Sequence, residues 1–218
     1  MTAIKFCGLT RVQDAQLAER AGARYLGVIL AGGPRLIDIE RAKQLLGVRR
    51  SGIERGAVFG DHSIDEVLRI AEFLDLDLLQ LHGDPTIEFV TALRARSDRA
   101  IWPVVRVEGT VLAPHAHELA HAAGTVVLDA KVVGQLGGTG VALDWHGLQK
   151  AVADFRDALP DVRIVLAGGL RAHNVAHALA LLHPDVVDVS SGVESAPGVK
   201  DHQAITQFAA AVHAAKGI

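Results

Sequence analysis

The stretch Ile4-Lys5-Phe6-Cys7-Gly8-Leu9-Thr10-Arg11 combines a short apolar run, a glycine and the start of a helical pattern. A strand, a glycine turn and a helix in this order form the repeating unit of proteins that alternate strands with helices. Cys7 is the only cysteine in the chain, and it stands at the carboxyl end of the strand, where such proteins carry their catalytic groups. The position therefore indicates a reactive thiol, although on position alone a buried, unreactive cysteine is an equal alternative.

The same unit recurs along the whole chain. Nearly continuous apolar runs, typical of parallel strands covered on both faces, cover residues 3–7, 25–29, 55–59, 78–81, 101–107, 125–128, 163–166 and 186–189. Helical patterns between them cover residues 12–21, 39–46, 64–74, 87–96, 118–123, 145–159, 174–182 and 204–215. Eight such units in 218 residues predict an α/β fold, a single-domain (β/α)8 TIM barrel over residues 1–218. A doubly wound parallel sheet is the alternative.

Composition limits the class of protein and its partners. Half of the residues are hydrophobic but only 4% are aromatic, so alanine, leucine and valine must build the core. The net charge is −3 and there is no basic run, which argues against nucleic acid as a partner. A single cysteine excludes an internal disulfide, and no apolar stretch reaches the roughly 20 residues of a membrane span. We expect a cytoplasmic protein that does not contact a membrane.

Glycines and polar residues follow several of the predicted strands. Gly-Gly turns occur in Gly137-Gly138-Thr139-Gly140 and in Ala167-Gly168-Gly169-Leu170, and Ser190-Ser191-Gly192 follows the last strand. Turns of this kind commonly hold phosphate, because glycine lets backbone N–H groups approach the oxygens. A thiol and such turns in one small chain predict an enzyme that acts on a phosphorylated metabolite.

Blocks of sequence, in order and along nearly the whole chain, resemble the phosphoribosylanthranilate isomerase family, a TIM barrel of tryptophan biosynthesis. They are Lys5-Phe6-Cys7-Gly8-Leu9-Thr10-Arg11, Gln80-Leu81-His82-Gly83, Leu128-Asp129, Gly137-Gly138-Thr139-Gly140, Asp144-Trp145, Leu166-Ala167-Gly168-Gly169-Leu170, Asn174-Val175, Asp188-Val189-Ser190-Ser191-Gly192-Val193-Glu194, Pro197-Gly198 and Lys200-Asp201. The resemblance implies an Amadori rearrangement of N-(5-phosphoribosyl)anthranilate. This chemistry requires an acid at the furanose oxygen and a base at the sugar's C2 carbon, with no metal and no redox cofactor.

The resemblance also implies the residues that catalyse the reaction. Cys7 matches the family's general base and Asp129 its general acid. The period of the first strand places Lys5 and Cys7 on one face and Ile4 and Phe6 on the other, so we expect Lys5 and Cys7 to point into the barrel. A nearby ammonium favours the thiolate form of a cysteine.

Substrate binding follows from the same matches. Arg35 corresponds to the residue expected to hold the anthranilate carboxylate, and Gly33 stands where Ser is commoner in the family. The phosphate is expected between the turn of Gly168 and Gly169 and the turn of Ser191 and Gly192. The Gly137-Gly138-Thr139-Gly140 segment is interpreted as a hinge and lid over the sugar.

Two other functions are open on the sequence. Another phosphosugar barrel, of the indole-glycerol-phosphate synthase or ribulose-phosphate epimerase type, needs charged or metal-binding groups at strand ends that are not found here in the required set. A non-catalytic barrel that binds the aryl amino-sugar phosphate as a sensor would lose Cys7 or Asp129, and both are present. The sequence does not decide between a monomer and a homodimer, and His82 receives no assigned role.

Overall fold

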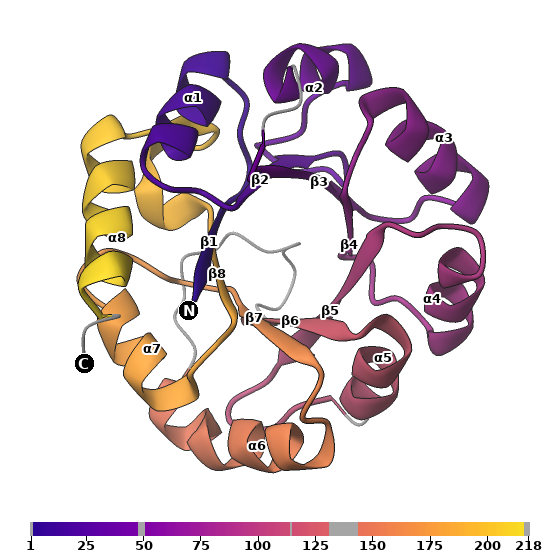
Figure 1. Ribbon diagram of the computed structural model, residues 1–218, viewed down its shortest axis with the longest axis vertical. Coiled ribbons are helices and arrows are strands. Elements are labelled where there is room, and N and C mark those ends of the chain that lie inside the picture. Colours follow the sequence, from indigo (N-terminus) through magenta and orange to yellow (C-terminus); the bar gives the residue numbers. More distant parts are fainter. Residues whose placement is uncertain (1, 48–50, 114, 131–143, 216–218) are drawn as a thin grey trace.

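Eight parallel strands close into a barrel in the computed structural model of the chain, which describes residues 2–47, 51–113, 115–130 and 144–215. The predicted (β/α)8 barrel is confirmed, and the doubly wound sheet is wrong because β1 pairs with β8 along its whole length. Each strand pairs with its neighbours in sequence order, as Figure 1 shows down the barrel. The strands are β1 (Ala3–Phe6), β2 (Tyr25–Ile29), β3 (Glu54–Phe59), β4 (Leu78–Leu81), β5 (Ala100–Val107), β6 (Thr125–Ala130), β7 (Arg163–Leu166) and β8 (Val186–Val189).

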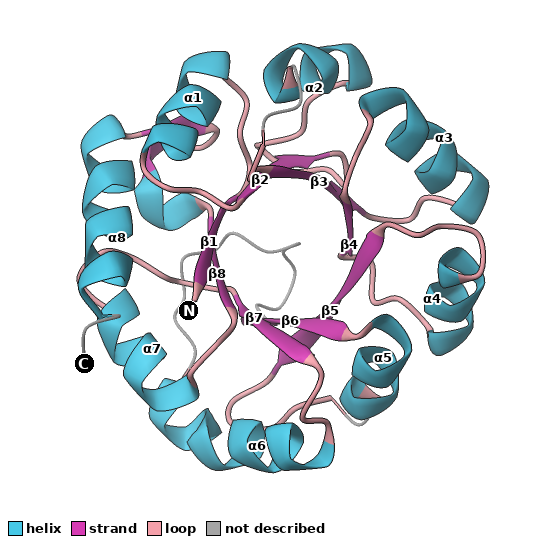
Figure 2. Ribbon diagram, in the orientation of Figure 1, coloured by secondary structure: helices cyan, strands magenta, loops and turns pink. Residues whose placement is uncertain are grey.

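A ring of helices surrounds the strands (Figure 2). Side-chain caps fix the starts of two helices: Ser63 accepts a hydrogen bond from the Glu66 amide in a capping box, and Thr86 accepts one from the Phe89 amide. The helices are α1 (Val12–Arg20), α2 (Ile39–Leu46), α3 (Ile64–Leu74), α4 (Ile87–Arg94), α5 (Ala116–Ala123), α6 (Trp145–Ala158), α7 (Val175–Leu182) and α8 (His202–Ala214). No helix of the described segments is long and apolar enough to cross a membrane.

Side chains of each strand alternate between two buried layers. Ile4 and Phe6 belong to the layer between strands and helices, as the period of the first strand predicted. A smaller cluster with Tyr25 and Trp102 fills the barrel itself, their rings 4.9 Å apart edge to face. The interior is therefore a packed core that closes the amino end of the barrel and leaves polar side chains for the carboxyl end.

A short segment between β8 and α8 contains a hairpin that was not predicted. One turn of 3-10 helix (Ser191–Val193) leads into β9 (Glu194–Ala196), which pairs antiparallel with β10 (Val199–Lys200) before α8 begins. Strands of two or three residues are too short to show a period in the sequence. This hairpin brings Glu194 and Lys200 beside the carboxyl end of the barrel.

Candidate active site

Cys7 lies at the carboxyl end of β1, where its amide donates a hydrogen bond to the carbonyl of Val189 on β8. The thiol is buried, and it shares the barrel interior with the Lys5 side chain. A Cβ atom at Gly27 of β2 would lie 3.1 Å from both the Cys7 Sγ and the Lys5 Nζ. The absence of a side chain at Gly27 therefore makes room for the thiol and the ammonium side by side.

A buried ion pair links the first and last strands of the barrel. The Lys5 Nζ lies 2.7 Å from the Asp188 Oδ2, and the two side chains are 1% and 5% exposed. Lys5 and Asp188 are register partners across β1 and β8, which explains why their side chains meet. Burial opposes the charge on Lys5, but the Asp188 and Cys7 side chains outweigh burial and raise the pKa of Lys5 above its ordinary value.

The protonation of Cys7 depends on two opposing effects. Burial raises the pKa of the Cys7 thiol, because a thiolate in a low-dielectric interior loses its hydration. The Lys5 ammonium lowers it, through its charge and a hydrogen bond, while Asp188 raises it and Lys200 lowers it. The balance leaves the thiol pKa above its ordinary value, and without the charges of the two lysines it would be raised further.

Asp129 lies on β6, two residues beyond Val127, which belongs to the interior cluster. The period of the strand therefore turns the Asp129 carboxyl into the mouth of the barrel. His82, directly after β4, approaches it: the His82 Nε2 lies 4.0 Å from the Asp129 Oδ2. Burial, with the nearby charges of Arg106 and Lys5, lowers the pKa of His82 to about 4, so the imidazole is neutral at physiological pH.

Arg35 follows β2 and turns toward the hairpin after β8. Its guanidinium makes a two-pronged ion pair with Glu194, with the Arg35 Nη2 2.7 Å from the Glu194 Oε2. The stem of Arg35 crosses Gly8, where an added Cβ would lie 2.6 Å from the Arg35 Cδ. Since Gly8 adopts a φ of +67°, both its conformation and its lack of a side chain are needed at this turn. Arg35 is thereby held next to Cys7.

The two glycine turns predicted to bind phosphate lie against each other. Gly168 and Gly169 have φ angles of +86° and +64° in the turn after β7. Gly192 approaches this turn so closely that an added Cβ would lie 1.8 Å from the Leu170 carbonyl oxygen. The Asn174 side chain closes the turn by donating to the Gly169 carbonyl at 3.0 Å. Ser191 and Gly192 therefore adjoin the first turn, as a shared anion cradle requires.

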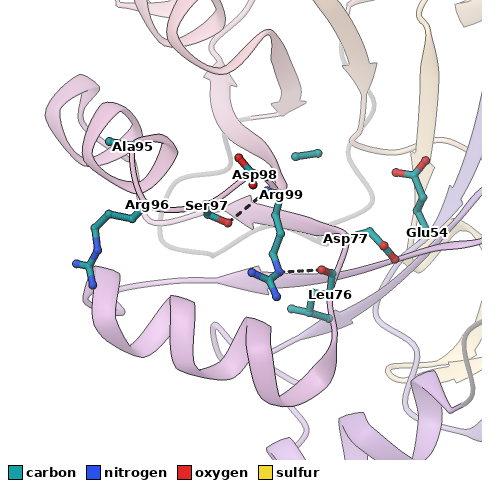
Figure 3. Close-up of a pocket in the computed structure, with 9 residues that line it drawn as sticks. Glu54, Leu76, Asp77, Ala95, Arg96, Ser97, Asp98 and Arg99 are labelled. Carbon is teal, nitrogen blue, oxygen red and sulfur yellow. Dashed lines mark hydrogen bonds between the residues drawn. The ribbon is translucent and has the colours of Figure 1, made fainter.

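Among the described residues, pockets lie at both ends of the barrel. One of about 520 Å³ opens at the carboxyl ends of β4 and β5, with Val104 and Arg106 in its wall. Another, of about 880 Å³, lies at the amino ends of β3, β4 and β5 (Figure 3). There Arg99 donates to the Leu76 carbonyl at 2.9 Å. Catalytic groups of such barrels come from the carboxyl ends of strands, so the second pocket belongs to the structural end.

In the part of the chain that the structure describes, no group of three histidine, cysteine, aspartate or glutamate side chains is placed to hold a metal ion. The predicted hinge and lid, Gly137-Gly138-Thr139-Gly140, lies outside the described residues.

Sequence reasoning assigned no role to Asp188, Glu194 or Lys200. A usable signal existed for Asp188, because a charged residue in the middle of the apolar run 186–189 must face either the helices or the barrel interior. Glu194 and Lys200 carried no such signal, because their meeting with Arg35 depends on the β9–β10 hairpin.

The closed barrel of eight parallel strands, with its polar side chains and glycine turns gathered at the carboxyl ends of the strands, has the arrangement of a (β/α)8-barrel enzyme. Within that class the chain belongs to the N-(5′-phosphoribosyl)anthranilate isomerase family, whose model matches residues 4–211. The resemblance found in the sequence is thus confirmed.

Individual relatives agree with this family. The chain is 35% identical to the N-(5′-phosphoribosyl)anthranilate isomerase of Acidithiobacillus ferrooxidans over 215 residues, which cover 97% of this chain and 98% of that protein. The structure of this chain is similar to that of phosphoribosyl anthranilate isomerase from Thermus thermophilus, with a TM-score of 0.81 and 32% identity. The match covers 98% of this chain and 99% of the Thermus chain. A phosphoribosyl anthranilate isomerase solved in complex with reduced 1-(o-carboxyphenylamino)-1-deoxyribulose 5-phosphate matches with a TM-score of 0.78 and 28% identity over both full chains.

Proposed function

We propose that this chain converts N-(5-phosphoribosyl)anthranilate into 1-(2-carboxyphenylamino)-1-deoxyribulose 5-phosphate, with Cys7 as the general base and Asp129 as the general acid. The observation that carries the proposal is the arrangement at the carboxyl end of the barrel. The Cys7 thiol lies beside the buried Lys5 ammonium, the charge of Lys200 also acts on it, and the Asp129 carboxyl enters the same mouth from β6. Membership of the isomerase family supports the same reaction.

The reaction takes place in three stages: ring opening, formation of an enolamine and tautomerisation. Asp129 gives a proton to the furanose oxygen, the bond from that oxygen to C1 breaks, and the nitrogen lone pair forms a C1=N double bond, which leaves a protonated imine. Cys7 then removes the proton from C2, the electrons of that C–H bond form the C1–C2 double bond, and the C1=N electron pair returns to the nitrogen to give a neutral enolamine. Tautomerisation of the enolamine places a proton on C1 and leaves the ketone at C2. Hydrogen moves within the substrate overall, so no external oxidant or reductant is consumed.

Lys5 has a supporting role in the second step. A thiol removes a proton from carbon only as the thiolate, and burial disfavours that form. The Lys5 ammonium, held by Asp188 at 2.7 Å, supplies the compensating charge at the Sγ. Asp188 in turn keeps the ammonium protonated in the barrel interior.

The carboxylate end of the substrate is bound by a positive charge, and its phosphate end is bound by backbone N–H groups. Arg35 binds the anthranilate carboxylate, since a guanidinium matches a planar carboxylate through paired hydrogen bonds. The adjoining turns of Gly168, Gly169, Ser191 and Gly192 bind the phosphate through backbone N–H groups. The replacement of the commoner serine by Gly33 removes a hydroxyl from the Arg35 loop and leaves the guanidinium in place.

The wider setting of the protein is also part of the proposal. Residues 1–218 form one catalytic domain, which works in the cytoplasm as a monomer or a homodimer and takes a small-molecule substrate of tryptophan biosynthesis. A gel-filtration measurement with light scattering decides between the two oligomeric states.

The decisive test follows the decay of fluorescence intensity as freshly generated phosphoribosylanthranilate is consumed, with the wild type, Cys7→Ala and Asp129→Ala measured side by side. We expect decay with the wild type alone, while all three proteins bind the reduced product analogue. If no protein gives decay but all bind the analogue, the barrel is a sensor and the catalytic proposal is wrong. If Cys7→Ala retains the wild-type rate, the base is a different group.

A further inference from the structure

One edge of the Arg35 guanidinium is already occupied within the protein. The Arg35 Nε lies 2.8 Å and 3.1 Å from the two carboxylate oxygens of Glu194, and the Nη2 lies 2.7 Å from the Oε2. The two side chains are 9% and 4% exposed, so the pair is removed from water. A two-pronged pair of this kind fixes the plane and the direction of the guanidinium as well as its position.

A second cation holds Glu194 from the other side. The Lys200 Nζ lies 2.8 Å from the Glu194 Oε1 and also donates to the Ser190 carbonyl at 3.0 Å. Glu194 of β9 and Lys200 of β10 are register partners in the hairpin, so the backbone itself sets their separation. Although burial opposes ionisation, Arg35 and Lys200 hold the pKa of Glu194 below its ordinary value. Glu194 is therefore a fixed anion and not a titrating one at neutral pH.

The remaining edge of Arg35 is the one available to a ligand. Among the residues that the structure describes, every hydrogen bond of the Arg35 side chain goes to Glu194 through the Nε and the Nη2. The Nη1 side of the fork is left, on a stem that crosses Gly8 directly after Cys7. The two cations and one anion of this cluster carry a net charge of +1, which complements the single charge of an aryl carboxylate.

We propose that Glu194 is a positioning residue for substrate recognition: it holds the Nε–Nη2 edge of Arg35 so that the Nη1 side receives the substrate's aryl carboxylate. Lys200 fixes Glu194 in turn. The inference rests on the proposed role of Arg35 in binding that carboxylate. It makes the β9–β10 hairpin a part of the specificity apparatus, because this hairpin carries the residues that aim the guanidinium.

An alternative role for Glu194, competition with the substrate for Arg35, predicts the opposite change in affinity for a carboxylate ligand. If Glu194 merely competed with the substrate for Arg35, removing its charge would free the guanidinium and tighten the binding of a carboxylate ligand. If Glu194 aims the guanidinium, the amide of Glu194→Gln offers one acceptor oxygen in place of two and turns an NH2 group toward two cations. Carboxylate binding then weakens, because a guanidinium without a fixed plane loses paired hydrogen bonds.

The experiment compares two ligands by calorimetry: 1-(2-carboxyphenylamino)-1-deoxyribitol 5-phosphate and the phenylamino analogue that lacks the carboxylate. For Glu194→Gln we expect Kd for the first ligand to rise about tenfold or more, the loss typical of a charge-assisted hydrogen bond. The affinity for the second ligand stays unchanged. In turnover the same variant raises KM and leaves kcat close to that of the wild type. Glu54→Gln, which breaks the 2.6 Å Arg24–Glu54 pair at the opposite end of the barrel, is the matched control and changes neither affinity.

Glu194→Asp keeps the charge and shortens the side chain by one methylene, so it restores part of the lost affinity for the carboxylate ligand. If Glu194→Gln does not fold, Glu194→Asp tests the proposal in its place, and we then expect partly weakened binding of the carboxylate ligand only. Unchanged or tighter binding of the carboxylate ligand, or equal weakening of both ligands, overturns the inference. If the wild type binds both ligands but turns over no phosphoribosylanthranilate, the proposed reaction is wrong while the ligand comparison still decides the role of Glu194.

Discussion

Removing the Lys5 ammonium should destabilise the protein by an amount that the structure bounds. In Lys5→Met the apolar stem is kept, but the Asp188 carboxylate loses the partner that now lies 2.7 Å away in a nearly water-free interior. The Asp188 Oδ1 already has no hydrogen-bond partner among the described residues. Breaking one side of a buried ion pair typically costs about 3–5 kcal/mol, and we expect a loss in that range in the free energy of unfolding by urea.

A double variant separates the cost of a stranded charge from the loss of packing. Replacing both partners of a buried pair by apolar residues is often close to neutral, so Lys5→Met with Asp188→Leu should recover most of the lost stability. Trp102 and Trp145, both buried, report the unfolding by fluorescence. A single Lys5→Met variant that loses less than about 1 kcal/mol would show that Asp188 is not left as an uncompensated charge.

The rate should not recover with the stability. Both variants lack the cation beside Cys7, and burial then raises the pKa of the thiol further above its already raised value. Because the base must be deprotonated, kcat/KM rises with pH, and the rising limb moves to higher pH in both variants. Each unit of that move costs about tenfold in thiolate below the pKa. A double variant with the wild-type pH profile would refute the assignment of Lys5 to Cys7.

Other substitutions test the site one function at a time. Cys7→Ser should lower kcat by about 10²–10⁴-fold, the usual contribution of a general base, with the affinity for the reduced product analogue measured by calorimetry unchanged. Asp129→Asn should lower kcat far more than it weakens binding of that analogue, and comparable losses in both would indicate a binding role. Gly192→Ala should weaken binding of the phosphorylated analogue but not of its dephosphorylated form. The new Cβ would lie 1.8 Å from the Leu170 carbonyl oxygen, so the turn has to shift. His82, with a pKa lowered to about 4 by burial, stays neutral in the folded protein, so its contribution to stability is present above the unfolded value of about 6.5 and is lost as pH falls toward 4. Between pH values of about 6.5 and about 4, the free energy of unfolding measured by urea titration should fall by roughly 3 kcal/mol less in His82→Gln than in the wild type. An equal fall in both proteins would contradict the buried neutral imidazole.

The strands and helices were predictable because their signals are local. The runs 25–29, 78–81, 163–166 and 186–189 were predicted with the bounds that the structure has. Differences at other ends follow from caps: α8 begins at His202, two residues earlier than predicted, because the Asp201 side chain accepts from the Ala204 amide. The direction of Lys5 and Cys7 into the barrel followed from the period of one strand, and the structure confirms it.

The partners of the site residues were not predictable, because they come from remote parts of the chain. Arg35 meets Glu194 across 159 residues, through a hairpin whose strands are too short to show a pattern. Lys5 meets Asp188 across 183 residues, and only closure of the barrel makes them neighbours. The sequence therefore indicated which side chains lie at the strand ends, and it left open which charges compensate one another there.

The Lys5–Asp188 pair joins the first strand of the barrel to the last strand of the barrel, and this has a consequence during synthesis on the ribosome. Until β8 has left the exit tunnel, the ammonium of β1 has no carboxylate and cannot be buried without cost. In a nascent chain that stops before residue 188, the first strand of the barrel therefore stays exposed to water, and Cys7 lacks the ordered Lys5 ammonium beside it. We therefore expect activity only once the barrel is closed, and we expect chains that end before β8 to be inactive and readily degraded by proteases.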